Sequence, residues 1–484
     1  MAMDANPAPL YLSVADDLAG LIANGQLKAP ARVPSVRRLA QQRGVSITTA
    51  VASLRVLEQR GLIVARPKSG YFVASRRTQA PEPVAVDLPR TARLVGAQAM
   101  LKRLAEASLN PVVARLGQAI PDPALFPEAA LRAAQVRSLQ RQPRLLSDYP
   151  LRMGGSAALR SEIGMHYARV GAQVDSQDIV ITNGCMEALA LAVRAVAKPG
   201  DTIAVESPTY FGFLQIAENL GVKVLEVPMH PRDGLSIESL RALLSGRSGQ
   251  AIRACMVTPN FSNPTGASLP LARKQELVRL CREADIALIE DDIYGDLPHE
   301  GPRPLPCKAF DTDGRVLLCS SFSKTLAPGA RIGFIAPGRY RDTARAIKQM
   351  LSGATAMPAQ EMLATYLASG RYERHLRRMR LRCAEQVGRI SEDVQAAFPV
   401  GTRLSRPQGG FVLWLELPGE ADTYRLYDEA NRVGVDFVPG ALFSASGRYT
   451  NCLRLNCGFP VSAETGAAIR RLGKLAAAAV RTRS

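Results

Sequence analysis

Apolar and polar residues alternate with helical spacing along the first sixty residues of the chain. Between residues 10 and 27, the apolar positions fall three or four apart, which predicts an amphipathic helix: Leu10, Val14, Leu18, Leu21, Ile22 and Leu27. A second, shorter helix is expected to begin after Ser35 and to end near Gly44. A third is expected over 47–60, with Gly61 just beyond its end.

Two helices joined by a short turn at Gly44 form a helix-turn-helix, whose second helix enters the major groove of DNA. Residues 62–73, LIVARPKSGYFV, then read as a hairpin with a basic tip, which is a wing. The net charge of the chain is +18, and residues 1–80 hold 11 Lys and Arg against 4 Asp and Glu. This dense positive charge makes nucleic acid the first partner to expect.

Residues 76–110 lack a clear period at their start. The segment RRTQAPEPVAVDLPR is rich in proline and charge and is expected to be an extended linker. Residues 94–107 regain helical spacing, so the linker is expected to dock on its neighbour. The pattern therefore divides the chain into a winged helix-turn-helix over 1–75, a linker over 76–110 and a large domain over 111–484.

In the large domain, short and almost wholly apolar runs alternate with helical stretches: DIVITNG, TIAVESP, KVLEVPM, ACMVTP, IALIEDDIY and RVLLCSSFSK. Strands buried on both faces and separated by helices indicate an α/β domain with a mostly parallel sheet. Ligands of such sheets bind where the strands end and the loops begin.

The loops after these runs carry the polar residues. A turn at Asn183-Gly184-Cys185 is of the type that holds a phosphate on backbone N–H groups. Further along the chain, the loops supply one amide, one carboxylate, one phenol, one amine, two hydroxyls and one guanidinium: Asn263, Asp291, Tyr294, Lys324, Ser321, Ser323 and Arg331. Pyridoxal phosphate (PLP) needs this set, because a lysine forms an imine with its aldehyde and a carboxylate keeps its pyridine nitrogen protonated.

Cysteine spacing and hydropathy exclude other classes of protein. The eight cysteines include no Cys-x-x-Cys pair, and with four histidines they do not have metal-site spacing. No secretion signal opens the chain and no run of about 18 apolar residues occurs, so a cytoplasmic protein with free thiols and no membrane partner is expected.

Residues 10–73, from LYLSVADDL to SGYFV, resemble the winged-helix domain of GntR-type regulators. The resemblance implies contacts with double-stranded DNA from a set of basic and small polar residues: Arg37, Ser46, Thr48, Thr49, Lys68 and Gly70. Short hydroxyls at a helix N-terminus can bond phosphate oxygens beside exposed N–H groups. Ile47 and Val51 stand where relatives use arginine, which leaves base readout open.

The motifs of residues 111–480 resemble the fold-type-I PLP aminotransferases, whose large domain is followed by a small C-terminal α+β subdomain. The resemblance implies Lys324 as the imine lysine, Asp291 on the pyridine nitrogen, and Asn263 and Tyr294 on the 3′-oxygen. It places Ser321, Ser323, Arg331 and the backbone of Gly184 and Cys185 on the phosphate. It also implies a ring-stacking residue, a residue that reaches a neighbouring subunit's phosphate, and an arginine for an α-carboxylate: Tyr210, Tyr149 and Arg454.

The two halves together look like the MocR group of regulators, which implies a homodimer. The main hypothesis is a PLP-dependent transcriptional regulator that senses an amino compound or a PLP vitamer through the imine on Lys324. Two alternatives remain: an active aminotransferase with an appended DNA-binding head, and a regulator that no longer uses PLP.

Overall fold

The structure is a computed structural model that describes residues 9–24, 26–27, 31–59, 62–66, 70–73, 80–96, 114–150, 154–246 and 252–481. The chain divides into two compact units, with the boundary between Gln79 and Ala80. Among the described residues, no helix is long and apolar enough to cross a membrane.

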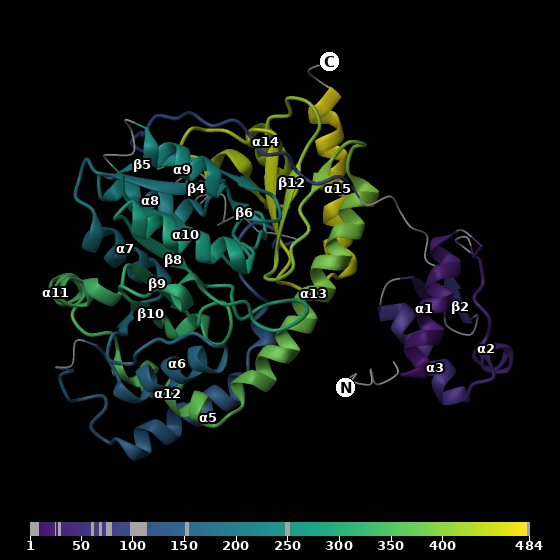
Figure 1. The fold of residues 1–484 in the computed structure, drawn as a ribbon, viewed down its shortest axis with the longest axis horizontal. Coiled ribbons are helices and arrows are strands. Elements are labelled where there is room, and N and C mark those ends of the chain that lie inside the picture. The colour runs from purple at the N-terminus through teal and green to yellow at the C-terminus, as the bar shows by residue number, and fades with distance from the viewer. Residues whose placement is uncertain are drawn as a thin grey trace, which may run out of the picture. The chain divides into compact units, whose positions relative to one another are not determined.

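The smaller unit is called the head. Its described residues form three helices and a two-stranded antiparallel sheet (Figure 1): α1 (Leu10–Ala23), α2 (Val36–Arg43), α3 (Ile47–Gln59), β1 (Ile63–Arg66) and β2 (Gly70–Val73). The Ser35 hydroxyl caps α2 by accepting the Arg38 N–H, and Gly44 ends α2 with a left-handed φ of 63°. Leu18, Leu39 and Leu54 are buried between the helices. The helix-turn-helix therefore follows the hydrophobic pattern, although α1 ends four residues before Leu27.

Residues 80–96 belong to the larger unit and run along it without helix or strand. The Leu404 N–H donates to the Pro81 carbonyl at 2.9 Å, and Arg93 forms an isolated bridge with Val224. The N–H at Nε of Arg232 donates to Glu82 and is shared between its two carboxylate oxygens. This half of the linker is thus docked on the large unit, whereas most of the helix predicted over 94–107 lies outside the described residues.

The large unit is built on an eight-stranded sheet of order β3-β10-β9-β8-β7-β4-β5-β6. The five strands β5, β4, β7, β8 and β9 are parallel, while β10 is antiparallel to both neighbours and β6 is antiparallel to β5. The strand bounds are β3 (Val180–Thr182), β4 (Thr202–Ser207), β5 (Lys223–His230), β6 (Gly234–Leu235), β7 (Ile252–Val257), β8 (Ala287–Asp291), β9 (Val316–Ser321) and β10 (Gly333–Ala336). The mostly parallel sheet expected from the apolar runs is confirmed.

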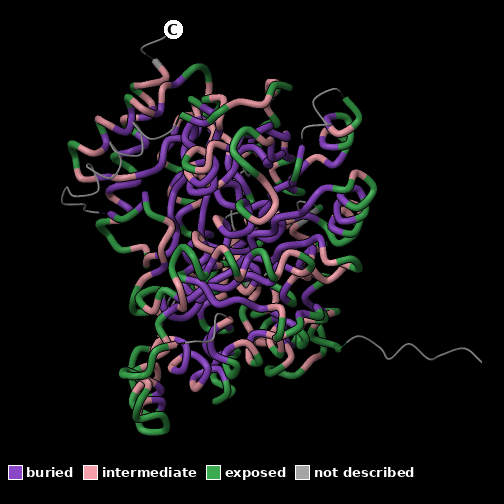
Figure 2. The backbone as a smooth tube through the Cα atoms, turned by 90° about the vertical axis from the view of Figure 1, so that its left-hand side faces the viewer, coloured by how far each residue is buried: buried purple, intermediate pink, exposed green. Residues whose placement is uncertain are grey.

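Helices surround this sheet, so its strands are buried on both faces. Figure 2 shows buried backbone in the interior of the large unit and exposed stretches along its outer helices. The helices of this layer are α5 (Glu128–Arg141), α6 (Ala157–Arg169), α7 (Cys185–Val196), α8 (Phe211–Asn219), α9 (Ile237–Ser245), α10 (Leu271–Glu283), α11 (Arg341–Leu351) and α12 (Met357–Ala368).

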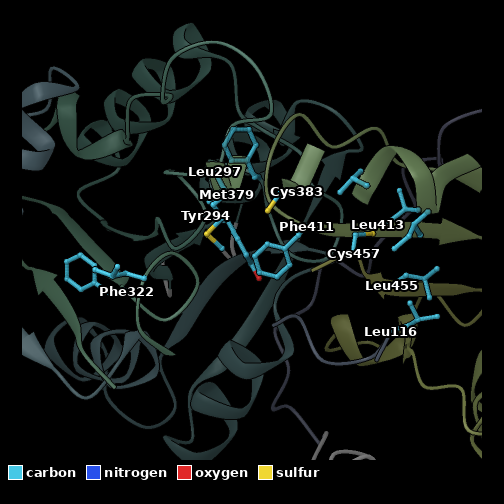
Figure 3. Packing of buried hydrophobic residues seen from close by; sticks show 14 of the residues in the cluster. Leu116, Tyr294, Leu297, Phe322, Met379, Cys383, Phe411, Leu413, Leu455 and Cys457 are labelled. Carbon is cyan, nitrogen blue, oxygen red and sulfur yellow. The ribbon is translucent and has the colours of Figure 1, made fainter. Parts of the chain in front are cut away.

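A small C-terminal α+β subdomain follows, with an antiparallel sheet of order β11-β12-β14-β13. Its elements are α13 (Tyr372–Ala397), β11 (Arg403–Leu404), β12 (Val412–Glu416), α14 (Thr423–Arg432), β13 (Val438–Pro439), β14 (Cys452–Asn456) and α15 (Ala463–Arg481). One buried cluster joins this subdomain to the large sheet (Figure 3): the Tyr294 and Phe411 rings pack edge to face at 5.4 Å, beside Leu297 and Met379. This packing holds the sheet of the small subdomain in place against the large sheet.

Candidate functional site

A cavity of about 520 Å³ lies at the carboxyl ends of β8 and β9, where the strand-end rule predicts a ligand site. Ten of the residues expected at the cofactor and effector site line it: Cys185, Tyr210, Asn263, Asp291, Tyr294, Ser321, Ser323, Lys324, Arg331 and Arg454. They come from distant parts of the chain, and the fold of the sheet brings them together.

Lys324 stands three residues after the end of β9 and lines the cavity. Its Nζ donates a hydrogen bond to the Ala119 carbonyl at 2.7 Å. Burial, together with the nearby positive charges of Arg454 and Arg331, lowers the pKa of Lys324 to about 8. A fraction of the amine is therefore neutral near pH 7, which is the form that can attack a carbonyl carbon.

Asp291 is the last residue of β8 and is buried. Its Oδ1 accepts hydrogen bonds from the Cys185 thiol at 3.5 Å and from the Ile293 N–H at 3.2 Å. Burial raises the pKa of Asp291 to about 7, although these two hydrogen bonds and the charge of Lys324 oppose the rise. A cationic ring nitrogen bound beside Asp291 would stabilise the ionised form of this buried carboxyl.

Arg331, Ser323 and the start of α7 lie together in an arrangement that could attract an anion. Nη1 of Arg331 donates to Oγ of Ser323 at 3.2 Å, and the Ser323 N–H donates to Oγ of Ser321. Gly184, the N-cap of α7, has a φ of 81°, and a Cβ at this position would lie 2.6 Å from Nη2 of Arg331. Glycine is needed here so that the guanidinium can lie against the backbone at a helix N-terminus, where N–H groups attract anions.

Three polar side chains from different loops complete the cavity wall. Asn263 is buried, and its Oδ1 has no hydrogen-bond partner among the described residues. Tyr294 is buried against Phe411, and burial raises its pKa above the ordinary value. Burial also raises the pKa of Tyr210 to about 12, so both phenols stay protonated and can donate hydrogen bonds at neutral pH.

Arg454, in the middle of β14, is 1% exposed and lines the same cavity. Its Nη2 donates to the Gly117 carbonyl, and its Nε has no partner among the described residues. Its guanidinium lies 5.7 Å from the centre of the Phe443 ring. A buried cation with an unused N–H is costly, and a carboxylate in the cavity would supply the missing acceptor.

The structure does not bring the side chain of Tyr149 to the cavity wall. It is 83% exposed and does not line the cavity. Because the resemblance assigned it to the phosphate of a neighbouring subunit, its role stays a prediction.

One segment that lines the cavity was not predicted from the sequence. Residues 117–120 line the site, and two of their carbonyls hold Lys324 and Arg454. Asp436 also lines the site, where its Oδ1 accepts the Leu116 N–H at 2.7 Å. A loop that acts through its backbone carries no side-chain signal, so neither feature could be found from residue types.

In the head, three of the predicted DNA contacts lie at the N-terminus of α3: Ser46, Thr48 and Thr49. The Ser46 hydroxyl accepts the Thr49 N–H at 3.1 Å and lies 2.8 Å from Oγ1 of Thr49, which caps the helix. Arg37 on α2 and Thr48 are exposed, and the Ile47 side chain is 58% exposed. An exposed isoleucine beside hydroxyls can contact a thymine methyl group.

The predicted wing is the antiparallel pair β1 and β2. Gly70 opens β2 with a φ of 96°, and a Cβ there would lie 3.4 Å from Nη2 of Arg32. Lys68 at the tip lies outside the described residues.

Two families match the chain. The family described as aminotransferase class I and II matches residues 114–472, and the one described as bacterial regulatory proteins, gntR family, matches residues 10–73. The HTH-type transcriptional regulators YjiR and YdcR of Escherichia coli (strain K12) are 38% and 34% identical to this chain. Each alignment covers 96% of this chain and 98% of the relative.

Solved aminotransferases resemble the larger unit. The kynurenine aminotransferase of Pyrococcus horikoshii, in complex with PMP, superposes with a TM-score of 0.73 at 28% identity over 79% of this chain and 95% of its own. The α-aminoadipate aminotransferase LysN of Thermus thermophilus, complexed with N-(5′-phosphopyridoxyl)-L-leucine, superposes with a TM-score of 0.70 at 26% identity over the same shares.

Proposed function

Because the chain belongs to the MocR group, in which a gntR-family DNA-binding domain precedes a class I and II aminotransferase domain, we propose that it is a PLP-dependent transcriptional regulator. The head binds double-stranded DNA, and the cavity of the large unit holds PLP and senses an amino compound or a PLP vitamer. The observation that carries this proposal is the half-buried amine of Lys324 in one cavity with Asp291 and Arg331, in a chain that also carries the head.

The unsatisfied polar atoms of the cavity fit PLP. Oδ1 of Asn263 is a buried acceptor without a partner among the described residues, and the Tyr294 phenol is a buried donor in the same cavity wall, so the pair suits the 3′-oxygen of the ring and its proton. The close approach of Arg331 to Gly184 leaves a guanidinium and a helix N-terminus for the phosphate. When bound, PLP supplies an aldehyde for the Lys324 amine and a ring that accepts electrons.

The residues of the chain have separate tasks in this proposal. Asp291 holds a proton on the ring nitrogen, and Cys185 holds Asp291. Tyr210 covers one face of the ring. Arg454 binds the carboxylate of an effector and gains the hydrogen-bond acceptor that its Nε lacks. These roles describe a site that selects an amine with a nearby carboxylate.

In the head we assign phosphate contacts to Arg37, Thr48, Thr49 and the N–H groups that Ser46 leaves exposed at the start of α3. Lys68 and Gly70 of the wing approach the minor groove. The winged helix-turn-helix occupies 1–75 and the linker 76–110. The regulator is a homodimer that works in the cytoplasm, where both DNA and PLP are available.

Regulation requires that the ligand of the cavity favour one arrangement of the heads over another. Each tenfold change in DNA affinity corresponds to about 1.4 kcal/mol of differential binding. The cavity lies between the large sheet and the small subdomain, so a ligand that bridges Lys324 and Arg454 joins two parts that can close on each other.

A second function, transamination, is favoured by the lowered pKa of Lys324, since the same amine could serve as a proton carrier in turnover. Aromatic-amino-acid aminotransferase 1 of Thermococcus litoralis is 28% identical over 75% of this chain and 87% of its own length. Steady formation of a 2-oxo acid from an amino acid, with pyruvate or 2-oxoglutarate as acceptor, would favour the enzyme over the sensor.

A footprint of the purified protein on the DNA upstream of its own gene, with and without PLP, tests both halves. We expect a protected segment whose extent or half-saturation point changes when PLP is added. Protection that is identical at every PLP concentration, although absorbance shows that PLP is bound, would remove the sensing role and keep the DNA-binding role.

A further inference from the structure

Helix α13, the long helix at the edge of the large unit in Figure 1, carries a row of exposed arginines at its N-terminal end. Arg374, Arg377 and Arg378 are three or four positions apart, and Arg371 is the N-cap of the same helix. All four side chains are exposed, and none forms a hydrogen bond or ion pair with another described residue. We call these four residues the arginine face.

Two glutamates of α13 pair with other arginines of the same helix. Arg380 pairs with Glu373 at 2.8 Å, and Arg382 pairs with Glu385 at 3.0 Å. Glu373 lies between Arg371 and Arg374 in the chain, but its carboxylate pairs with Arg380, so none of the four arginines has an ion pair with a described residue.

This arrangement is unfavourable for the isolated helix. Like charges three or four positions apart repel each other by a few tenths of a kcal/mol per pair, and cations at a helix N-terminus oppose the helix dipole. Packing explains only the opposite side of α13, where Leu376, Met379 and Cys383 are buried in the core. An anionic partner would turn the repulsion between the arginines into a favourable contribution.

The shape of the arginine face suits a nucleic-acid backbone. Residues 371–378 span about 10 Å at a rise of about 1.5 Å per residue. A DNA strand offers a phosphate about every 3.4 Å along its axis, so about three phosphates fall within this length. Arginine matches phosphate with two parallel N–H groups, and the buried side of α13 holds the row rigid.

We infer that the arginine face of α13 is a second DNA-binding surface of the chain, which contacts the phosphates that flank the segment bound by the head. The inference rests on the proposed function, because it takes the DNA partner from there. It adds that the large unit, which resembles an enzyme, itself holds DNA and contributes to affinity without reading sequence.

The test replaces the arginines of α13 in the full-length protein: Arg374→Gln, Arg377→Gln and Arg378→Gln together. Affinity for DNA is measured at several salt concentrations, because each phosphate contact contributes a slope of about 0.9 in a plot of log K against log salt. Two duplexes are used: the segment protected in the footprint, and the same segment trimmed to the site of the heads.

A control variant removes the same number of charges from other faces of the large unit: Arg194→Gln, Arg253→Gln and Arg279→Gln on α7, β7 and α10, all exposed. On the long duplex, we expect the slope of log K against log salt to be smaller in magnitude for the α13 variant than for the wild type, by about 2 to 3 per bound chain. On the trimmed duplex, the two slopes should be equal. The control variant is expected to change neither slope by as much as about 1.

Equal slopes for the α13 variant and the wild type on the long duplex would overturn the inference. So would a change in oligomeric state of the α13 variant, because the face would then be a contact between subunits, or an equal loss in both triple variants, which would show only a general effect of charge. If the wild type itself binds no DNA, the proposed function fails first, and the two failures are thereby distinguished.

Discussion

The Cys185 thiol donates a hydrogen bond to Oδ1 of Asp291, so the first residue of α7 is tied to the last residue of β8 beneath the cavity. The bond lowers the pKa of Asp291, whose carboxyl is otherwise pushed towards its neutral form by burial. A cysteine that looked like part of a phosphate-binding turn thus acts, through its side chain, on the carboxylate that would face the pyridine nitrogen.

Replacing Cys185 with alanine should therefore raise the pKa of Asp291 further. PLP affinity is measured from the visible absorption of PLP between about pH 6 and pH 9. On acidification, the affinity of the alanine variant should begin to fall at a higher pH than that of the wild type. The Cys185→Ser variant keeps a donor and should stay close to the wild type. Coincident profiles for wild type and Cys185→Ala would show that the thiol does not control Asp291.

The pKa of Asp291 also predicts how stability depends on pH in the protein without PLP. Folding raises the pKa of Asp291 from 3.8 to about 7, so the contribution of this group to the free energy of unfolding falls as pH rises from about 4 to about 7. A shift of about three units corresponds to at most about 4 kcal/mol. Asp291→Asn should therefore be more stable than wild type to urea at about pH 8, with the difference shrinking at about pH 4. An equal difference at both pH values would contradict the raised pKa.

Gly184→Ala should selectively weaken phosphate binding by Arg331, Ser323 and the start of α7. Alanine at a φ of 81° carries a strain of about 1 to 3 kcal/mol, and its Cβ would displace Arg331. We expect roughly a tenfold or greater loss of PLP affinity, which spectroscopic titration can measure. Gly200→Ala, at a φ of 90° with open space around its Cβ, is the matched control, since it carries backbone strain without touching the cavity.

Leu54→Ala should separate the two units functionally. Leu54 is buried in the head, and such truncations cost about 2 to 5 kcal/mol, a large part of the stability of a small domain. Sequence-specific binding by the head should be lost at room temperature or slightly above, while PLP absorbance and the main thermal transition of the large unit stay unchanged. Parallel loss of PLP would show that the units do not fold separately.

Arg454→Gln should reduce the response to amines that carry a carboxylate. Hydrogen bonds to charged groups contribute about 1.5 to 3 kcal/mol, so a loss of about 10- to 100-fold in effector affinity is expected. Amines without a carboxylate should be affected far less. Arg448→Gln, an exposed arginine of the same subdomain that does not line the cavity, is the control. An unchanged affinity in Arg454→Gln would assign the carboxylate to another group.

Periodicity and strand-end loops predicted much of this molecule, because both have strong local causes. The apolar runs that end at Thr182, Ser207, Asp291 and Ser321 became β3, β4, β8 and β9, and the carboxyl ends of these strands carry the site. Lys324 was recognisable because a lysine amid hydroxyls and an arginine after a buried strand is unusual.

Features set by tertiary contacts could not be predicted. The carbonyls of Gly117 and Ala119 hold Arg454 and Lys324, which lie 337 and 205 positions away in the chain, with no side chain to mark them. Asp436 could not be predicted from the sequence either, since its partner is the backbone N–H of Leu116. The arginine face was also missed, because total charge does not say which arginines lack an ion-pair partner.

The central claim is that cofactor capture at Lys324 changes the DNA affinity of the same chain. Its most direct test is a titration of PLP into the cofactor-free protein, with visible absorption and affinity for the footprinted DNA followed on one sample. We predict that the two curves share a midpoint, and that Lys324→Ala loses both responses while Lys198→Ala, an exposed lysine of the same unit, keeps them. A DNA affinity that stays constant through the titration, or that responds equally in Lys324→Ala, would contradict the account.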